Sequence, residues 1–196
     1  MQIVWNIDNL ASIGGHPLRV LGHPQVVDAP TGRGLHFGGL DDGVVVPAHP
    51  LEGADRFTAE VIFRPEAGGA PEQRFLHLQE AGGEDRILFE TRLTEGRTWY
   101  LDTFVQSGEA SRAQLAREHQ HPLDQWYHAA LVYDGREMRH YVNGSLEMAH
   151  PIAVRPPGPG NTAIGVRLNE VYWFRGAICW ARFTLQALEP SAFWAL

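Results

Sequence analysis

Charged side chains alternate with apolar ones in the segment 86–93. Arg86, Glu90 and Arg92 stand at even-numbered positions, so in a β-strand they point to one face while apolar side chains point to the other. Asp102 takes the matching face of the next alternating segment. Carboxylates and guanidinium groups form strong hydrogen bonds with hydroxyl groups. This face therefore suits a hydroxyl-rich ligand, unless the charges only pair with one another across a solvated sheet face.

The composition indicates one globular domain over residues 1–196, with 44% hydrophobic and 20% charged residues. The formal net charge is −7 and no basic run occurs, which argues against a nucleic acid or an anionic membrane as partner. The single Cys179 excludes an internal disulfide. The first residues lack a basic region followed by an apolar one, and no stretch is long enough to span a membrane. The sequence as written therefore predicts a cytoplasmic protein.

The clearest element is a β-hairpin expected over residues 126–142. Its first arm alternates as far as Asp134-Gly135, and after its second arm Asn143-Gly144 permits another tight turn. We expect residues 107–120 to form a polar loop with at most one helical turn, and residues 189–194 to form a short helical turn. Further strands are expected at 3–5, 18–21, 25–27, 44–46, 57–63, 74–78, 86–93, 98–105, 162–166 and within 171–185. An all-β fold follows.

Several of these segments carry a family resemblance. They are Trp-Tyr-His at 126–128, Tyr-Asp-Gly at 133–135, Tyr-Val-Asn-Gly at 141–144, the turn and Val-rich strand at 37–47, and Ile-Gly at 164–165. Together they resemble the laminin G-like, concanavalin A-like lectin/glucanase superfamily, from about residue 34 to the last strand. The resemblance implies an antiparallel jelly-roll sandwich of two sheets. The superfamily includes lectins, adhesion modules, glycosidases and lyases, so the fold does not decide the function.

The resemblance implies two places for a ligand, because many members of the family bind sugars on the concave sheet or at the rim loops. Non-catalytic carbohydrate binding is therefore our leading hypothesis. The candidates on the concave face are Arg86, Glu90, Arg92, Asp102, His128 and His140. The rim candidates are Arg167, Asn169 and Trp173, whose indole can cover the apolar side of a sugar ring. His128 also fits a packed, hydrogen-bonded histidine at the start of a strand.

A polysaccharide-cleaving enzyme is the first alternative. Retaining glycosidases need two carboxyl groups about 5 Å apart. The glucanase branch of the superfamily supplies them as Glu-x-Asp-x-x-Glu on one strand, and that motif is absent here. Glu84 and Glu90 share a face but stand six residues apart, which is too far in a regular strand. The lyase branch is matched only loosely, by Arg86, Glu90, Arg92, His77 and Tyr100.

A structural or protein-interaction module that forms a homodimer is the second alternative. It requires an exposed apolar patch, for which Trp5, Trp173 and Trp194 are the candidates.

The sequence predicts no cofactor other than a possible calcium ion. The Asp41-Asp42 turn offers oxygen ligands of the kind that Ca²⁺ prefers, and the resembling family often holds Ca²⁺ at a rim. Acidic turn residues also commonly bind their own backbone instead. The ten histidines lack the spacing of a zinc site.

Overall fold

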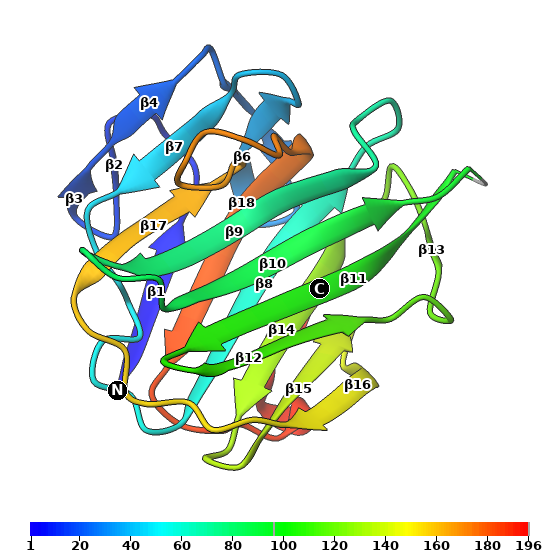
Figure 1. The fold of residues 1–196 in the computed structure, drawn as a ribbon. Coiled ribbons are helices and arrows are strands. Elements are labelled where there is room, and N and C mark those ends of the chain that lie inside the picture. The colour runs from blue at the N-terminus through cyan, green and yellow to red at the C-terminus, as the bar shows by residue number, and fades with distance from the viewer. Residues whose placement is uncertain (96, 196) are drawn as a thin grey trace.

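Alternation of apolar and polar residues builds two large antiparallel sheets that pack face to face (Figure 1). The computed structural model describes residues 1–95 and 97–195. We name the sheet that faces the viewer in Figure 1 the front sheet and the one behind it the back sheet. Each contains eight strands, and a short hairpin of β2 (Ser12–Ile13) and β3 (His16–Pro17) stands apart from them. The all-β jelly-roll prediction is confirmed.

The order of strands in each sheet differs from their order along the chain. The front sheet runs β12 (Ala110–Leu115), β11 (Thr98–Ser107), β10 (Arg86–Leu93), β9 (Glu72–Glu80), β17 (Gly160–Ile164), β7 (Gly43–Val46) and β4 (Arg19–Leu21), with β13 (His121–Pro122) beside β11. The back sheet runs β16 (Ser145–Pro151), β15 (Glu137–Val142), β14 (Tyr127–Tyr133), β8 (Phe57–Pro65), β18 (Arg175–Thr184), β6 (Gly32–Gly38) and β5 (Gln25–Ala29), with β1 (Gln2–Asn6) beside β18. Neighbours in either sheet are often far apart in sequence.

The expected hairpin is confirmed as β14 and β15. Asn143 and Gly144 both adopt positive φ angles, 49° and 77°, and lead directly into β16. The short helical turn near the C-terminus is also present, as a 3-10 turn over Pro190–Ala192. In the part of the chain that the structure describes, no helix is long and apolar enough to cross a membrane.

The expectation of a polar loop over 107–120 is wrong. A turn at Gly108 sends the chain back along β11, and Ala110–Leu115 forms the edge strand β12. Its polar residues suit an edge strand that has solvent on one side, while the Gln114 side chain turns into the interior and donates to the Met138 carbonyl oxygen at 3.0 Å. The sequence of β12 shows no alternation of apolar residues because this edge strand makes few contacts with the core.

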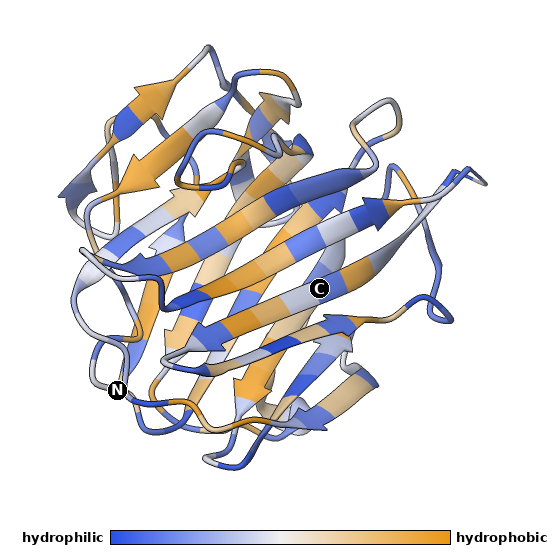
Figure 2. Cartoon of the chain, viewed as in Figure 1, coloured by the Kyte–Doolittle hydropathy of each residue, from blue (hydrophilic) through white to orange (hydrophobic). Residues whose placement is uncertain are grey.

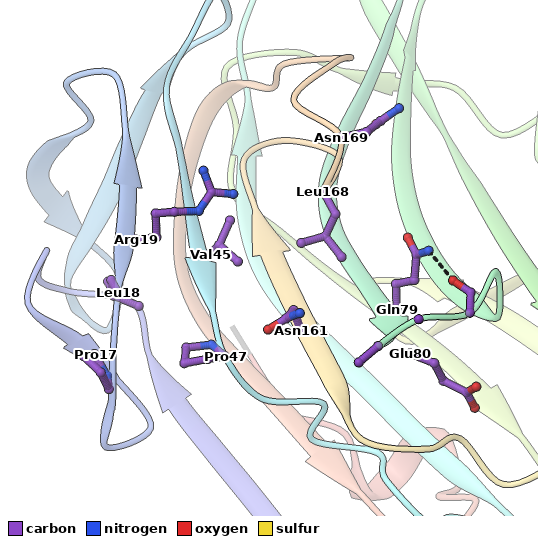
Figure 3. A pocket seen from close by; sticks show the side chains of 13 residues that line it. Pro17, Leu18, Arg19, Val45, Pro47, Gln79, Glu80, Asn161, Leu168 and Asn169 are labelled. Carbon is purple, nitrogen blue, oxygen red and sulfur yellow. Dashed lines mark hydrogen bonds between the residues drawn. The ribbon is translucent and has the colours of Figure 1, made fainter.

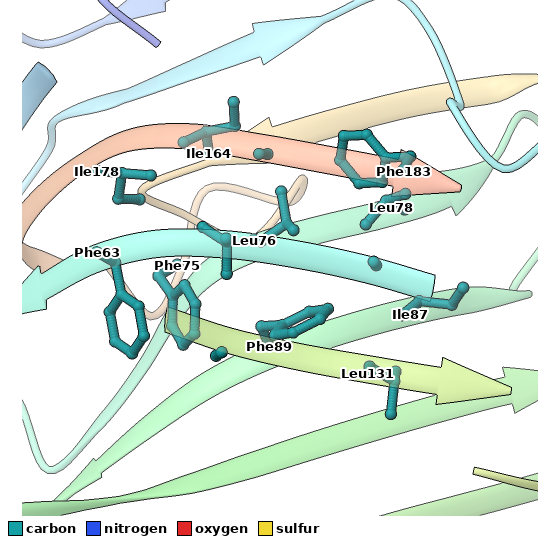
Figure 4. Packing of buried hydrophobic residues seen from close by; sticks show 14 of the residues in the cluster. Phe63, Phe75, Leu76, Leu78, Ile87, Phe89, Leu131, Ile164, Ile178 and Phe183 are labelled. Atoms are coloured by element: carbon teal, nitrogen blue, oxygen red, sulfur yellow. The ribbon is translucent and has the colours of Figure 1, made fainter. Parts of the chain in front are cut away.

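Aromatic and aliphatic side chains fill the space between the sheets (Figure 4). Phe63 of the back sheet stacks on Phe75 of the front sheet, with ring centroids 4.2 Å apart and planes inclined by 10°. Phe75 contacts Phe89 edge to face, and Trp99 meets Phe63 in the same way. These rings couple the two sheets, because each strand directs alternate side chains into the shared core.

The outer face of the front sheet is mixed in character. Charged pairs lie on it together with the apolar cluster of Val45, Ala163 and Val166. The blue and orange blocks that alternate along β9, β10 and β11 in Figure 2 include the residues of both faces. A loop over residues 165–174 crosses part of this face before the chain enters β18 (Figure 1). Gly165 begins the loop with a positive φ of 81°, and a Cβ there would lie 2.5 Å from the Phe37 ring. The loop carries all three rim candidates of the sequence analysis.

Replacing Phe63 by alanine should lower the free energy of unfolding by about 3–5 kcal/mol, because the stacked pair with Phe75 would leave a cavity between the sheets. Urea denaturation measures this change. Leu40→Ala serves as the control, since Leu40 is 80% exposed and its loss should change stability by less than about 0.5 kcal/mol. Equal effects of the two substitutions would contradict the role given to the Phe63 stack.

Candidate functional site

Five charged side chains form an ion network on the outer face of the front sheet. Glu90 of β10 lies directly opposite Asp102 of β11 in the strand register. Arg92 donates from Nε to Asp102 Oδ2 at 2.8 Å and from Nη2 to Glu90 Oε2 at 3.3 Å. Arg74 of β9 contacts Glu90 Oε2 through Nη2 at 3.0 Å, and Glu72 accepts bonds from both arginines. Two of these members, Glu72 and Arg74, were not predicted, although they alternate on β9 as Glu90 and Arg92 do on β10.

Burial controls the protonation of this network. Burial, followed by the nearby Asp102 carboxylate, raises the pKa of Glu90 to about 7. Burial also raises the pKa of Asp102, against the effect of Arg92. A protonated Glu90 can donate a hydrogen bond to Asp102, which leaves Glu72 and Asp102 to balance the charges of Arg74 and Arg92. With Glu90 protonated, the five side chains together carry no net charge.

Cationic side chains and a histidine connect the network to the loop over 165–174. The Arg74 guanidinium lies 3.8 Å from the centre of the Tyr172 ring, which covers it. The Leu168 backbone N–H donates to Nδ1 of the buried His77 at 2.9 Å. Burial and then the positive charge of Arg167 lower the pKa of His77 to about 3, so its ring is neutral. Arg86 lies over the Phe104 ring at 4.9 Å.

An open cavity of about 660 Å³ lies on the same sheet face, beside the loop over 165–174 (Figure 3). We call it the front-sheet groove, and its lining residues are Pro17, Leu18, Arg19, Val45, Pro47, Gln79, Glu80, Ala81, Gly82, Gly83, Asn161, Leu168 and Asn169. Gln79 donates to the Gly83 carbonyl oxygen at 2.8 Å. Over residues 1–95 and 97–195, the side-chain amides of Asn161 and Asn169 have no hydrogen-bond partner. Polar groups with free donors and acceptors therefore line this groove beside aliphatic side chains.

The nine predicted site residues do not share one face. Arg86, Glu90, Arg92 and Asp102 lie together on the outer face of the front sheet. Asn169 lines the front-sheet groove, and Trp173 packs beside it against a small cluster of Val45, Ala163 and Val166. Arg167 belongs to the same loop, close enough to His77 to affect its pKa. His128 and His140 lie on the other sheet.

The prediction that His128 and His140 share the concave face with Glu90, Arg92 and Asp102 is wrong. Both belong to the back sheet, and they point to opposite sides of it. His140 faces the interior, where its Nδ1 lies 2.9 Å from Thr103 Oγ1, and burial lowers its pKa to about 3. His128 faces outward from the back sheet and bonds the buried Glu60 through Nε2 at 3.0 Å. Alternation along a strand gives the side to which a residue points, but not the sheet to which its strand belongs.

The Asp42 carboxylate of the Asp41-Asp42 turn binds two backbone N–H groups, one near the turn and one in another loop. Asp42 accepts from the His23 N–H through Oδ1 and from the Gly38 N–H through Oδ2, each at 2.7 Å. Among the described residues, no group of three or more His, Cys, Asp or Glu side chains could hold a metal ion.

The apolar patch expected from three tryptophans is not formed. Trp5 is buried and packs edge to face on Phe183, with ring centroids 5.0 Å apart. Trp173 is partly buried at the front sheet, whereas Trp194 is exposed and packs on Trp180 of the back sheet. The three side chains are therefore dispersed.

A two-sheet all-β sandwich with an open polar groove on one sheet defines a class of domains that includes many binding modules. The model of the concanavalin A-like lectin/glucanases superfamily matches residues 37–192, so the chain belongs to this family. No curated protein matches the sequence. Membership is consistent with the two observed sheets.

Solved structures share the fold at low sequence identity. Domain 4 of AbnA, a GH43 extracellular arabinanase from Geobacillus stearothermophilus in complex with arabinotriose, has a TM-score of 0.70 and 19% identity, covering 96% of this chain and 94% of that one. The binding domain of Paraclostridial Mosquitocidal Protein 1 has a TM-score of 0.69 and 12% identity, covering 97% and 50%. The Trypanosoma rangeli sialidase in complex with the inhibitor DANA has a TM-score of 0.65 and 15% identity, covering 96% and 31%.

The stability of the wild-type protein should depend on pH through Glu90. Between its ordinary pKa and about 7, the folded protein holds a proton on Glu90 that the unfolded chain has lost. The contribution of Glu90 to the free energy of unfolding should therefore fall by on the order of 2 kcal/mol as the pH rises from about 4.5 to 7. The lowered pKa values of His77 and His140 act in the opposite direction, and do so equally in the wild type and in variants of Glu90. In Glu90→Gln this part of the decrease should be absent, because the amide does not titrate.

Urea denaturation across this pH range measures both slopes. Glu84→Gln is the matched control, since the Glu84 side chain is 86% exposed, and it should keep the wild-type slope. A wild-type slope in Glu90→Gln would contradict the raised pKa.

Proposed function

We propose that the protein is a non-catalytic carbohydrate-binding module whose ligand lies in the front-sheet groove. The observation that carries this proposal is the pair of unpartnered side-chain amides, Asn161 and Asn169, in an open cavity of about 660 Å³. Ligand cavities typically measure about 300–1,000 Å³. The groove thus has the volume for a few sugar rings.

The lining of the groove matches the chemistry of a sugar. Each amide presents two donors and an acceptor, which can bond neighbouring hydroxyl groups. Arg19 adds a guanidinium that pairs with Glu170 at 2.8 Å. Leu18, Val45 and Leu168 supply an aliphatic wall for the C–H side of a ring. Polar groups that fix orientation and an apolar wall that excludes water are thus both present.

The β9–β10 register relates the groove to the predicted concave-face residues. Arg86 lies directly opposite Gln79, which lines the groove. An oligosaccharide longer than the groove would therefore extend towards Arg86 and then Arg92. We propose that Glu90 and Asp102 support this surface by holding Arg92 and Arg74 in place.

The fold relatives support a carbohydrate as the class of ligand. Domain 4 of the arabinanase was solved with arabinotriose and matches nearly the whole length of both chains. At 19% identity this similarity concerns the fold, so the particular sugar remains open to experiment.

Catalysis is the weaker candidate. Glu90 and Asp102 form a close carboxyl pair, as a glycoside hydrolase uses, although a hydrolase needs one protonated and one ionised group and burial raises the pKa of both. Both are buried, however, and they pair with Arg74 and Arg92 instead of facing a groove that could hold a substrate. Incubation with any bound oligosaccharide should release no new reducing ends and no unsaturated product. Release that disappears in Glu90→Gln would make the protein an enzyme.

Calcium at the Asp41-Asp42 turn is a subsidiary proposal. Binding measured with added Ca²⁺ and again with a chelator tests it, and a difference that disappears in Asp41→Asn would support it. Equal binding in both conditions would contradict a calcium site at this turn.

Asn161→Ala should weaken binding of a glycan selected on an array by about tenfold, because the alanine removes the hydrogen bonds of one amide. Titration calorimetry measures the dissociation constant. Asn6→Ala is the matched control, since Asn6 is exposed on β1 of the back sheet, away from the groove. Wild-type affinity in Asn161→Ala would place the ligand elsewhere, and no binding on the array would refute the function.

A further inference from the structure

The segment 188–194 crosses the outer face of the back sheet and is fastened there by buried groups. Leu188 N–H donates to Thr58 Oγ1, and Trp194 N–H donates to Glu60 Oε1, each at 2.9 Å. Arg182 joins the two layers, because it donates to both Glu60 and the Ala192 carbonyl oxygen, at 2.8 Å in each case. This fastening holds the aromatic side chains of the segment over the sheet.

Beside the fastened segment lies a cavity of about 520 Å³, which we call the clasp cavity. Its lining residues are Trp126, His128, Asn143, Gly144, Pro190, Ser191, Phe193, Trp194 and Ala195. None of them lines the front-sheet groove, which lies on the other sheet. The two cavities therefore face opposite directions on the sandwich.

Aromatic rings give the clasp cavity flat apolar surfaces in defined positions. The Trp194 indole is 42% exposed and packs on Trp180, with ring centroids 4.5 Å apart. Trp126 is partly buried, and the Arg64 guanidinium lies 5.3 Å from the centre of its ring. Phe193 is held between His128 and Tyr141. Rings that are already packed lose little entropy when a ligand stacks on them.

Hydrogen-bonding side chains accompany these rings. Burial alone would raise the pKa of Glu60, but the hydrogen bonds from His128 and Arg182 lower it overall, so Glu60 is a carboxylate. The His128 Nε2 atom bonded to it must then donate, and Nδ1 stays available to a ligand. Asn143 accepts from the His128 N–H through Oδ1 at 2.9 Å, which leaves its amide NH₂ to donate. Within the described residues, neither His128 Nδ1 nor the Asn143 NH₂ has a partner.

We propose that the clasp cavity is a second carbohydrate site, in which a sugar ring stacks on Trp126 or Trp194 and its hydroxyl groups bond His128 and Asn143. A site that combines aromatic faces with hydrogen-bonding groups favours a sugar ring over a purely apolar ligand. The proposal goes beyond the function proposed above, because two sites on opposite faces make the protein bivalent. A bivalent protein can bridge polysaccharide chains, and its avidity exceeds the affinity of either site.

Chemical shifts of the ¹⁵N-labelled protein locate the two sites separately. The ligands added are arabinotriose, xylotetraose, cellotetraose, maltotetraose and sialyllactose, and each serves as a probe up to millimolar concentration. Binding in the clasp cavity should shift the indole N–H signals of Trp126 and Trp194. Binding in the front-sheet groove should shift the side-chain amide signals of Asn161 and Asn169.

Two variants test the clasp cavity without removing its fastening. Trp194→Ala deletes an exposed ring but keeps the backbone N–H that binds Glu60. Asn143→Asp keeps the Oδ1 acceptor and tolerates the positive φ of this position, while it removes the donor. Each should weaken probe binding at the clasp cavity by about tenfold, with binding at the groove unchanged. Leu40→Ala is the control, because Leu40 is exposed and lines neither cavity.

The outcomes separate this inference from the proposed function. Shifts at Trp126 and Trp194 that Trp194→Ala and Asn143→Asp weaken would support the second site, whether or not the groove responds. Shifts confined to Asn161 and Asn169 would overturn the second site and leave the proposed function standing. Shifts at neither place with any probe would overturn both, and equal weakening by Leu40→Ala would show that the effects are not local.

Discussion

The close packing of aromatic rings between the two sheets is the interaction on which the rest of the structure depends. Phe63 and Phe75 belong to different sheets and stack at 4.2 Å, and further rings extend the contact along the sandwich. Because each strand alternates, burying these rings directs the intervening side chains outward on both sheets. The outer faces, where ligands can bind, are therefore a consequence of how the core is filled.

Both outer faces carry buried carboxylates, and a segment without regular strands covers part of each face. On the front sheet, Glu90 and Asp102 are bound by arginines, and the loop over 165–174 places Tyr172 on one of these arginines. On the back sheet, Glu60 binds His128 and Arg182 beneath the segment 188–194. A buried charge is stable only when it is paired and hydrogen-bonded, so these networks hold the covering segments in defined positions. A cavity opens beside each covering segment.

The same physical arrangement thus yields two different surfaces. The front-sheet groove combines side-chain amides with aliphatic residues, whereas the clasp cavity combines aromatic rings with a histidine and an amide donor. Aromatic stacking favours a flat sugar face, and amides favour vicinal hydroxyl groups. Two sites of such different lining would select different parts of a glycan.

The sequence by itself determined most of the strands, the faces by which they enter the core, and the family, but it missed the edge strands β12 and β16. Phe57–Phe63 and Arg86–Leu93 show this, since their alternation is a local property that each segment carries alone. It also indicated the ion network, because Glu90, Arg92 and Asp102 share a face of adjacent strands. Only the tertiary structure decided that His128 and His140 lie on the back sheet, on opposite sides of it, and that residues 165–174 and 188–194 cover the outer faces. The physical reason is that sheet membership and the paths of connections depend on pairing between residues far apart in sequence, and alternation carries no information about such pairing.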